Sequence, residues 1–347
     1  MRSSILAIVA VLALSSPATS QTALTPNVGG RVVPLPGGGG DFGWPGVYFE
    51  GRFTGSSVAV AVEPGAEHLA VSIDGQARTE LSQASAARTT FRGLGPGEHV
   101  VRLDKLTESQ SGSARFLGFF VGPGGHALPP RARARRIEFI GDSHTVGYGV
   151  RATKHDCTQA EIHDLTDTSL AFGPILARRL DADYRIVAFS GRGVVRNYGG
   201  FAGEPLPALY PRMIPGEAAP RVDPADPWRP DLIVIGLGTN DFSTPLQPGE
   251  AWPDDAALRA DYRRTYVAFI RDLAQRQPRA RFLLIAGDSF AEDVAAVVQT
   301  VDADVPGLAT PVRITGLDRG ACNYHPSIAD QRMMADRLET AARAVLP

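Results

Sequence analysis

The chain has 347 residues, of which 44% are hydrophobic and 21% are charged, and its formal net charge is -2. This composition excludes a disordered or fibrous protein and leaves enough length for two compact domains. The small net charge argues against a nucleic-acid partner. The one basic run, at residues 131–136, precedes an apolar strand pattern, and we interpret it as a solvated linker.

The amino terminus predicts export. Arg2 precedes an apolar run over residues 5–14, and the small residues at 15–20 predict a signal peptide over residues 1–20 with cleavage after Ser20. The apolar run of about ten residues is too short to cross a bilayer, which needs roughly 20. We therefore expect a secreted or periplasmic mature chain with no membrane partner.

The two cysteines, Cys157 and Cys322, are a candidate disulfide pair, because an exported protein folds in an oxidising compartment. A bridge between them would close a loop of about 165 residues, which the chain-entropy model values at roughly 5 kcal/mol. Two separate buried thiols are the alternative.

Alternating apolar residues dominate the chain between residues 21 and 125. Segments such as "VAVAV" (58–62) and "LAVSI" (69–73) place every second side chain on one face, and Gly-rich turns separate them. Short alternating strands joined by such turns are typical of an antiparallel β-sandwich or jelly roll. We expect this domain over residues 21–125, followed by a linker over residues 126–136.

The pattern then changes to strands that alternate with helices, over residues 137–347. Largely apolar runs such as "RIEFIG" and "DLIVIG" are each followed by a helical pattern. Buried strands of this kind indicate a parallel sheet with helices on both faces, a three-layer α/β/α domain. Ligands bind such sheets at the carboxyl ends of the strands, so we expect the catalytic groups there.

Ser143 is the candidate nucleophile. It follows the first of these strands in the sequence "GDSHTVGYG", at a turn where a hydroxyl can be presented to a base. A second Gly-Asp-Ser copy, residues 287–289, also follows a strand. We expect that copy to be structural, with Asp288 or Ser289 capping the next helix.

Three more strand ends carry candidate catalytic groups. Gly191 and Gly193 lie in the loop "FSGRGVVRN", and Asn240 lies in "GLGTNDF". A backbone N–H and a side-chain amide that converge on one point would form an oxyanion hole. His325, in "CNYHPS" near the end of the chain, is the candidate base.

In this order, the Ser, Gly, Asn and His blocks resemble the SGNH, or GDSL-type, hydrolase family. With a sandwich domain in front, the chain is similar to carbohydrate esterase family 2, acetyl esterases that act on plant cell-wall polysaccharides, over nearly all of its mature length. The resemblance implies Ser143 as nucleophile and His325 as general base and acid. It also implies the Ser143 N–H, Gly191 and Asn240 as oxyanion donors, with Gly193 as the alternative glycine. The implied partner is an acetylated polysaccharide or oligosaccharide, such as xylan or glucomannan.

The group that orients His325 is the unusual feature. Many SGNH hydrolases have an aspartate three residues before the histidine and some family 2 esterases have one two before it, whereas here these positions are Cys322 and Asn323. Neither can carry the negative charge that stabilises an imidazolium. The chain thus resembles members with a Ser-His dyad, in which a backbone carbonyl accepts the imidazole N–H. The amide oxygen of Asn323 and the carboxylate of Asp318 are the alternatives.

Three aromatic residues are candidates for a substrate cleft. Tyr324 adjoins His325, while Trp228 and Trp252 flank the asparagine block in loop-like sequence. Simple packing is the alternative for all three.

We expect no metal site and no other cofactor. The His, Asp, Glu and Cys side chains at residues 155–163 lack the regular spacing of a structural zinc site, and acyl transfer requires no metal.

Two other functions are compatible with parts of the sequence. One is an exported carbohydrate-binding protein with an inert esterase-like domain, but Ser143, Asn240 and His325 are all intact. The other is an SGNH lipase or thioesterase that acts on another small acyl ester. Such an enzyme would need an apolar groove, whereas the loops around the candidate site are rich in small and polar residues.

Overall fold

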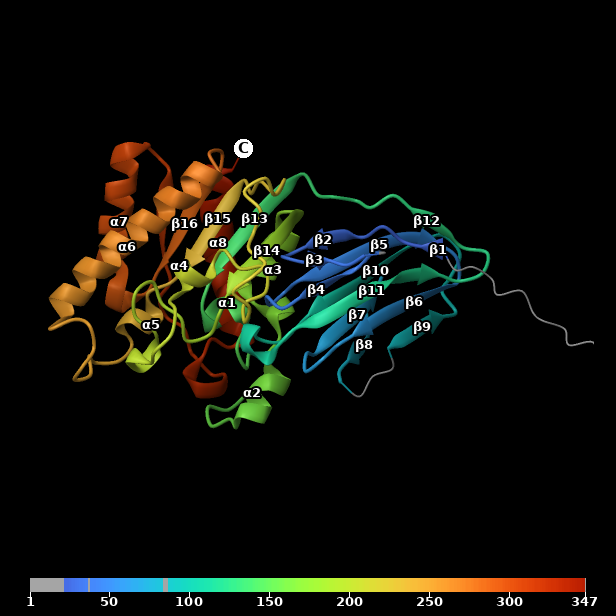
Figure 1. Cartoon of the computed structure of the whole chain (residues 1–347), viewed down its shortest axis with the longest axis horizontal. Helices are drawn as coiled ribbons and strands as arrows, with labels where there is room; N and C mark the ends of the chain where they lie inside the picture. Colours follow the sequence, from blue (N-terminus) through green and yellow to red (C-terminus); the bar gives the residue numbers. More distant parts are fainter. Residues whose placement is uncertain (1–21, 37, 84–86, 347) are drawn as a thin grey trace, which may run out of the picture.

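The structure of the protein is a computed structural model that describes residues 22–36, 38–83 and 87–346. The predicted signal peptide, residues 1–20, lies outside these residues. Two domains lie side by side in Figure 1, one built of β-strands and the other of strands and helices. Within the described residues, no helix is both long enough and apolar enough to span a membrane.

The first domain consists of two antiparallel sheets packed face to face. One sheet has the order β3-β4-β11-β6-β9, with β1 beside β11, and the other has the order β12-β5-β10-β7-β8, with β2 beside β5. The strands are β1 (Thr22–Ala23), β2 (Asn27–Gly29), β3 (Val33–Pro34), β4 (Gly40–Phe42), β5 (Tyr48–Thr54), β6 (Ser57–Glu63), β7 (Leu69–Ile73), β8 (Gln76–Leu81), β9 (Arg88–Arg92), β10 (Glu98–Lys105), β11 (Ala114–Val121) and β12 (His126–Leu128).

Alternation of side chains builds the core of this sandwich. In β7 and β10 every second residue is buried, and the inward residues of the two sheets meet across the domain. Phe116 is buried in this core, stacked on Phe49 and in edge contact with Phe119. The expected antiparallel sandwich is therefore present.

The segment expected to be a linker is partly regular. Its first residues, His126–Leu128, form β12 and pair with β5, and its last residues begin β13. Arg133, within the basic run, donates to Glu50 of the sandwich and Asp183 of the second domain, both at 3.0 Å. The interpretation of the whole run as solvated is wrong for Arg133, because its charge is used to join the two domains.

The second domain has a five-stranded parallel sheet in the order β14-β13-β15-β16-β17. Its strands are β13 (Arg135–Gly141), β14 (Ala182–Ala188), β15 (Leu232–Gly236), β16 (Arg281–Ala286) and β17 (Ala309–Arg313). Its helices are α1 (Ser143–Val146), α2 (Gln159–Leu165), α3 (Phe172–Arg179), α4 (Leu206–Leu209), α5 (Thr239–Phe242), α6 (Asp255–Arg276), α7 (Ala291–Asp304) and α8 (Ile328–Val345).

Helices cover both faces of this sheet, which is why a central strand such as β15 is continuously apolar. Alternate strand residues such as Phe139 and Val234 pack on α3 and α8, while their neighbours, such as Ile140 and Ile235, pack on α6 and α7. The predicted three-layer α/β/α fold is confirmed.

The register of the sheet places the loops after β13, β14 and β15 at the same height along the strands. Gly141, the last residue of β13, pairs with Ala188 of β14 on one side and with Gly236 of β15 on the other. The residues that follow these three positions therefore emerge together at the carboxyl edge of the sheet.

Candidate active site

Ser143 begins α1 directly after the tight turn that ends β13. Asp142 caps this helix, because its side chain accepts from the N–H of His144 at 3.0 Å. A Cβ added at Gly141 would lie 2.0 Å from Oγ1 of Thr145, so the turn requires glycine there. The turn holds the Ser143 side chain in a nearly buried position, 6% exposed.

His325 lies against this serine. Its Nε2 is 2.8 Å from Oγ of Ser143, and its Nδ1 is 3.0 Å from the carbonyl oxygen of Cys322 and 3.2 Å from that of Asn323. With Nδ1 donating to carbonyls, Nε2 is left as the acceptor that faces the hydroxyl. The pair thus has the geometry of a nucleophile and its general base.

The two side-chain alternatives for orienting His325 are not realised. The amide of Asn323 points to Tyr148 instead and donates to its hydroxyl at 3.0 Å, so Asn323 contributes only its backbone carbonyl. The carboxylate of Asp318 accepts from the N–H of Gly320. The dyad arrangement with backbone carbonyl acceptors is the one present.

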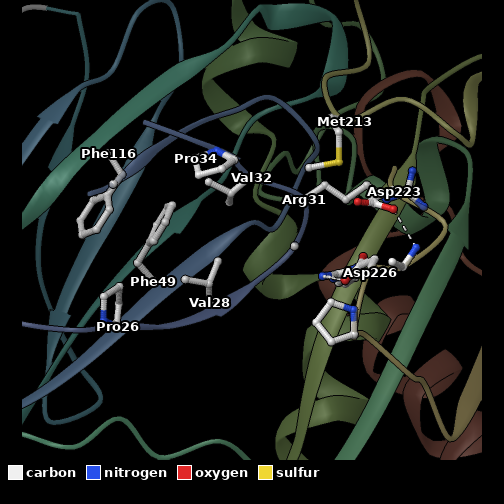
Figure 2. Close-up of a pocket in the computed structure, with 15 residues that line it drawn as sticks. Pro26, Val28, Arg31, Val32, Pro34, Phe49, Phe116, Met213, Asp223 and Asp226 are labelled. Atoms are coloured by element: carbon white, nitrogen blue, oxygen red, sulfur yellow. Dashed lines mark hydrogen bonds and ion pairs between the residues drawn. The ribbon is translucent and has the colours of Figure 1, made fainter. Parts of the chain in front are cut away.

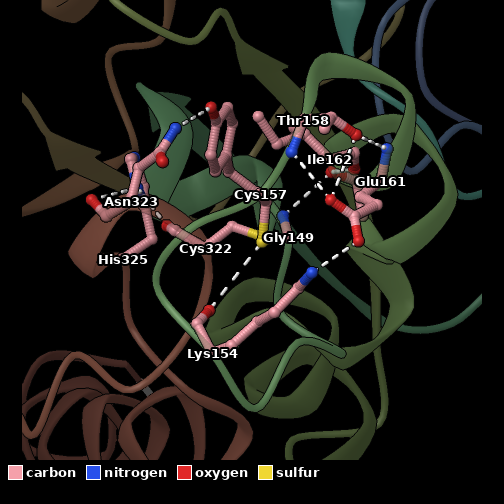
Figure 3. Close-up of a disulfide and its surroundings, with 11 residues drawn as sticks. Gly149, Lys154, Cys157, Thr158, Glu161, Ile162, Cys322, Asn323 and His325 are labelled. Carbon is pink, nitrogen blue, oxygen red and sulfur yellow. Dashed lines mark hydrogen bonds and ion pairs between the residues drawn. A yellow bond between two sulfur atoms is a disulfide. The ribbon is translucent and has the colours of Figure 1, made fainter.

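A disulfide holds the segment that carries His325. Cys157 and Cys322 are bridged, with Cα atoms 5.5 Å apart, and Figure 3 shows the bridge beside Asn323 and His325. A Cβ on Gly149 would lie 2.6 Å from that of Cys322, so the bridge packs directly on the loop after α1. The N–H of Asn323 donates to the carbonyl of His155 at 2.7 Å. The acceptor for Nδ1 is therefore anchored covalently to the nucleophile side of the site.

Aromatic rings enclose the imidazole of His325. Tyr148 stacks on it with centroids 4.1 Å apart, and His144 meets it edge to face at 5.7 Å. Burial lowers the pKa of His325 to about 4, against the opposing effect of its two carbonyl acceptors. Burial and the charge of His325 lower the pKa of His144 to about 3. Both rings are therefore neutral near pH 7, which leaves Nε2 of His325 able to accept a proton.

Asn240 lies on α5, at the end of the neighbouring strand β15. Its Nδ2 donates to the carbonyl of Arg192 at 2.9 Å and to Oδ2 of Asp142 at 3.2 Å. Asp142 thus contacts both the nucleophile turn and Asn240, and burial raises the pKa of its carboxyl to about 7. The amide of Asn240 is oriented from two of the loops that surround Ser143.

The two glycines of the β14 loop are required for different reasons. Gly191 has φ +80°, in the left-handed region that favours glycine. Gly193 packs on Asp241, because an added Cβ would lie 2.4 Å from Oδ2 of that residue. Gly193 thus has a packing reason to be glycine, whereas Gly191 has a conformational one.

Sequence reasoning missed three residues that support these loops. Asp241 accepts from the backbone N–H groups of Val194, Val195 and Arg196, at 2.9 to 3.1 Å. Arg196 is buried, pairs with Glu250 at 2.6 Å and donates to carbonyls after α5. Tyr148 carries the stacking contact on His325. All three lie inside the motifs quoted above, but their roles depend on contacts between separate loops.

The three aromatic candidates lie in different places. Tyr324 is 64% exposed beside His325, and its ring stacks on His155 at 4.0 Å. Trp252 donates to Asp261 on α6 at 2.9 Å. Trp228 precedes β15 at the amino edge of the sheet, under the guanidinium of Arg185, so the structure does not bring it to the edge where Ser143 lies.

Cavities occur both near the site and away from it. One of about 470 Å³ adjoins the site and is lined by His144, Thr239 and Arg319, among others. Figure 2 shows another, of about 550 Å³, between the sandwich and residues 223–227. Residues such as Phe49 and Arg185 line that second cavity, and none of the candidate catalytic residues does.

In the described part of the chain, one group of side chains gathers three potential metal ligands. His68, His163 and Asp164 bring ligand atoms within 4.8 Å of one another. Only His163 belongs to the segment 155–163 considered from the sequence, because His68 comes from the sandwich. His68 meets the ring of His163 edge to face and lies 3.6 Å from Asp164, so the group is a contact between the domains.

Known families match both domains. The carbohydrate esterase 2 N-terminal family matches residues 28–130, and the GDSL-like lipase/acylhydrolase family matches residues 139–345. An acetylxylan esterase / glucomannan deacetylase of Cellvibrio japonicus (strain Ueda107) is 40% identical over 304 residues, which cover 86% of this chain and 84% of that protein.

Solved structures agree with these matches. The structure of a carbohydrate esterase whose active site is described as having divergent catalytic and non-catalytic binding functions superposes with a TM-score of 0.87 at 37% identity, covering 93% of this chain and 98% of the other. A family two carbohydrate esterase from Clostridium thermocellum in complex with cellohexaose gives a TM-score of 0.80 at 28% identity, with 92% and 98% covered. The chain therefore belongs to the GDSL-like, or SGNH, family of ester hydrolases and, by its two-domain fold, to carbohydrate esterase family 2.

Proposed function

We propose that this protein is an exported acetyl esterase that removes O-acetyl groups from plant cell-wall polysaccharides, such as xylan or glucomannan. The observation that carries the proposal is the 2.8 Å contact between Ser143 Oγ and His325 Nε2 at the carboxyl edge of the sheet. The similarity to an acetylxylan esterase / glucomannan deacetylase over most of both chains supports the substrate class.

The first half of the reaction acylates Ser143. His325 Nε2 takes the hydroxyl proton as Oγ bonds to the acetyl carbonyl carbon, and the carbonyl oxygen becomes an oxyanion. The N–H of Ser143, the N–H of Gly191 and Nδ2 of Asn240 are the proposed donors to that oxyanion. Asn240 would exchange its longer bond, the 3.2 Å contact with Asp142, for the oxyanion.

The second half releases acetate. The intermediate collapses as His325 returns its proton to the departing sugar oxygen, which leaves an acetyl ester on Ser143. His325 then deprotonates a water molecule that attacks this ester, and protonation of Oγ completes the cycle. During both steps the imidazolium is stabilised by the carbonyls of Cys322 and Asn323, which carry only partial negative charge.

Tyr324 is the proposed platform for the polysaccharide. One face of its ring is covered by His155 and the side chain is 64% exposed, so a sugar can stack on the other face. Its position next to His325 would place that sugar close to the reacting ester.

Export is supported by the disulfide. A bridge between Cys157 and Cys322 persists in an oxidising compartment, which agrees with a signal peptide over residues 1–20. An extracellular or periplasmic enzyme would also meet polysaccharide substrates directly.

The test is acetate release from acetylated xylan and acetylated glucomannan by the purified mature protein. Release that disappears in Ser143→Ala would establish the esterase and its nucleophile, and the ratio of the two rates would identify the preferred polymer. Equal background with wild type and variant would overturn the proposal. Binding to the polymers without release would favour a carbohydrate-binding protein instead.

A further inference from the structure

The sandwich domain reaches the loop that carries Gly191. After β10 ends at Lys105, the chain turns toward the carboxyl end of β14. There Oγ of Ser109 donates to the carbonyl of Ala188, the last residue of β14, at 2.6 Å, and Oγ of Ser190 donates to the carboxylate of Glu108. Glu108 and Ser109 are both buried, 7% and 2% exposed. Two adjacent residues of the first domain thus hold the end of β14 and the loop that follows it.

A buried ion pair holds the segment between β10 and Ser109 in place. Lys105 and Glu67 are both fully buried, with Nζ and the carboxylate 2.8 Å apart. Nζ also donates to the carbonyls of Thr107 and Glu108, each at 2.8 Å. A buried ammonium is costly unless its donors are all used, and here two of them determine the backbone position of the segment. The buried ammonium of Lys105 therefore holds the backbone of Glu108 in place.

The loop that Glu108 holds lies alongside the nucleophile turn. The N–H of Phe189 donates to the carbonyl of Gly141 at 3.1 Å, which extends the β13–β14 ladder past the end of the strand. Ser190 is the next residue, and Gly191 follows it with a φ of +80°. The position of the Gly191 N–H thus depends on the position of Ser190. Hydrogen-bond donors in an oxyanion hole act only when they are held close to the developing charge.

We propose that the sandwich is part of the catalytic apparatus and that Glu108 is a positioning residue, which holds Ser190 and thereby the Gly191 N–H in place for the oxyanion. This inference rests on the proposed acyl-transfer function. It assigns the first domain a role in the chemical step, in addition to any contact that domain makes with a polysaccharide.

The test compares Glu108→Ala, Ser190→Ala and the double variant, with p-nitrophenyl acetate as a substrate that needs no glycan site. We expect kcat to fall about 10- to 30-fold in each single variant with KM unchanged, less than the roughly 10²–10³-fold loss on removal of an oxyanion donor itself. The double variant should lose no more than either single one, because both changes remove the same contact. Glu108→Gln should restore much of kcat, since its amide oxygen can still accept from Ser190.

Tyr48→Phe is the matched control. Tyr48 of the sandwich donates to Asp183 at 2.7 Å, so this variant also removes a buried hydrogen bond between the first domain and β14, but at the amino end of the strand. We expect it to lower the thermal unfolding temperature and to leave kcat unchanged. The proposal is overturned if Tyr48→Phe lowers kcat as much as Glu108→Ala does, or if Glu108→Ala and Ser190→Ala leave kcat at the wild-type value.

A second readout separates this inference from the substrate assignment. Ser143 should be labelled by a fluorophosphonate probe, whose tetrahedral adduct also uses the oxyanion hole, and the labelling rate should fall in Glu108→Ala by the same factor as kcat. If the wild-type protein is labelled at Ser143 but releases no acetate from polysaccharides, the substrate assignment is refuted and this inference is not. Equal labelling rates in wild type and Glu108→Ala would refute the inference alone.

Discussion

The tripeptide Gly-Asp-Ser occurs twice in this chain, each time directly after a strand of the same parallel sheet, and the two copies have different surroundings. In the copy after β13, Asp142 is buried and caps α1, and Ser143 contacts His325 at 2.8 Å. In the copy after β16, Asp288 is 65% exposed and pairs with Arg313 on β17 at 3.0 Å. Neither Asp288 nor Ser289 caps α7, whose N-cap residue is Phe290, so the expected cap is not present.

The neighbours of each strand account for the difference. β13 lies between β14 and β15, and the loops after those strands supply Gly191 and Asn240 at the level of Ser143. β16 lies between β15 and β17, and the segment after β17 lines one cavity with Ser289, whereas His325, further along the chain, contacts Ser143. In such a sheet, the loops on both sides of a motif thus determine whether it can act as a catalytic site. The tripeptide sequence alone does not distinguish the two copies.

Replacement of each serine by alanine, in separate variants, tests this comparison most strongly. Ser143→Ala should lower kcat by at least about 10⁴-fold, because it removes the proposed nucleophile. Ser289→Ala should leave kcat and KM unchanged, since that side chain is exposed and apart from the dyad. Steady-state rates on p-nitrophenyl acetate measure both. A large loss in Ser289→Ala would show that the second copy takes part in the reaction.

Replacement of the two aspartates should also lower kcat only in the first copy, and by less than replacement of Ser143 does. In Asp142→Asn, the new side chain can still cap α1, but its NH₂ group would face Nδ2 of Asn240 and displace that amide. We expect kcat to fall about 10²-fold, because Asn240 is a proposed oxyanion donor.

Asp288→Asn is the control for that variant, since it removes only an exposed ion pair, which is worth about 0–1 kcal/mol. Its kcat should match the wild type and its unfolding free energy should change little. Wild-type kcat in Asp142→Asn would show that Asn240 is positioned without Asp142.

The pH dependence of kcat/KM sharpens the comparison further, because only Ser143 has a histidine partner. Burial lowers the pKa of His325 to about 4. The neutral imidazole is the proposed active form, so kcat/KM should halve near pH 4 as His325 gains a proton. Burial raises the pKa of the Asp142 carboxyl to about 7, so its protonation adds a separate step near that pH, which Asp142→Asn removes. Rates measured on the free enzyme at low substrate concentration report this pKa. A midpoint near the ordinary histidine value of about 6.5 that persists in Asp142→Asn would contradict a buried dyad.

The smallest effect concerns Asn323. Its side-chain amide donates to Tyr148, while the contact with His325 is made by its backbone carbonyl. Asn323→Ala keeps that carbonyl and loses one partly exposed hydrogen bond, so kcat should fall only about two- to fivefold, or roughly 1 kcal/mol or less. His325→Ala, measured beside it, should lose nearly all activity. A loss in Asn323→Ala as large as that in His325→Ala would assign the orienting role to the side chain.

Much of the architecture was predictable because it depends on short-range patterns. The alternation in segments such as residues 69–73 predicted the sandwich, and the apolar runs that end at Gly141 and Gly236 predicted the parallel sheet. The strand ends then identified Ser143, Asn240 and His325 as neighbours in space. The network of Glu108, Asp241 and Arg196 was not predictable, because each contact joins loops that lie 45 to 82 residues apart in the chain.

The sequence by itself determined the chemical groups of the site and one absence: no carboxylate stands two or three residues before His325. It left open what holds the imidazole and whether Cys157 and Cys322 pair. The tertiary structure decided both together, because the bridge places Cys322 where its carbonyl accepts from Nδ1 of His325. Backbone carbonyls are present at every residue, so only the three-dimensional path of the chain selects which one orients a histidine.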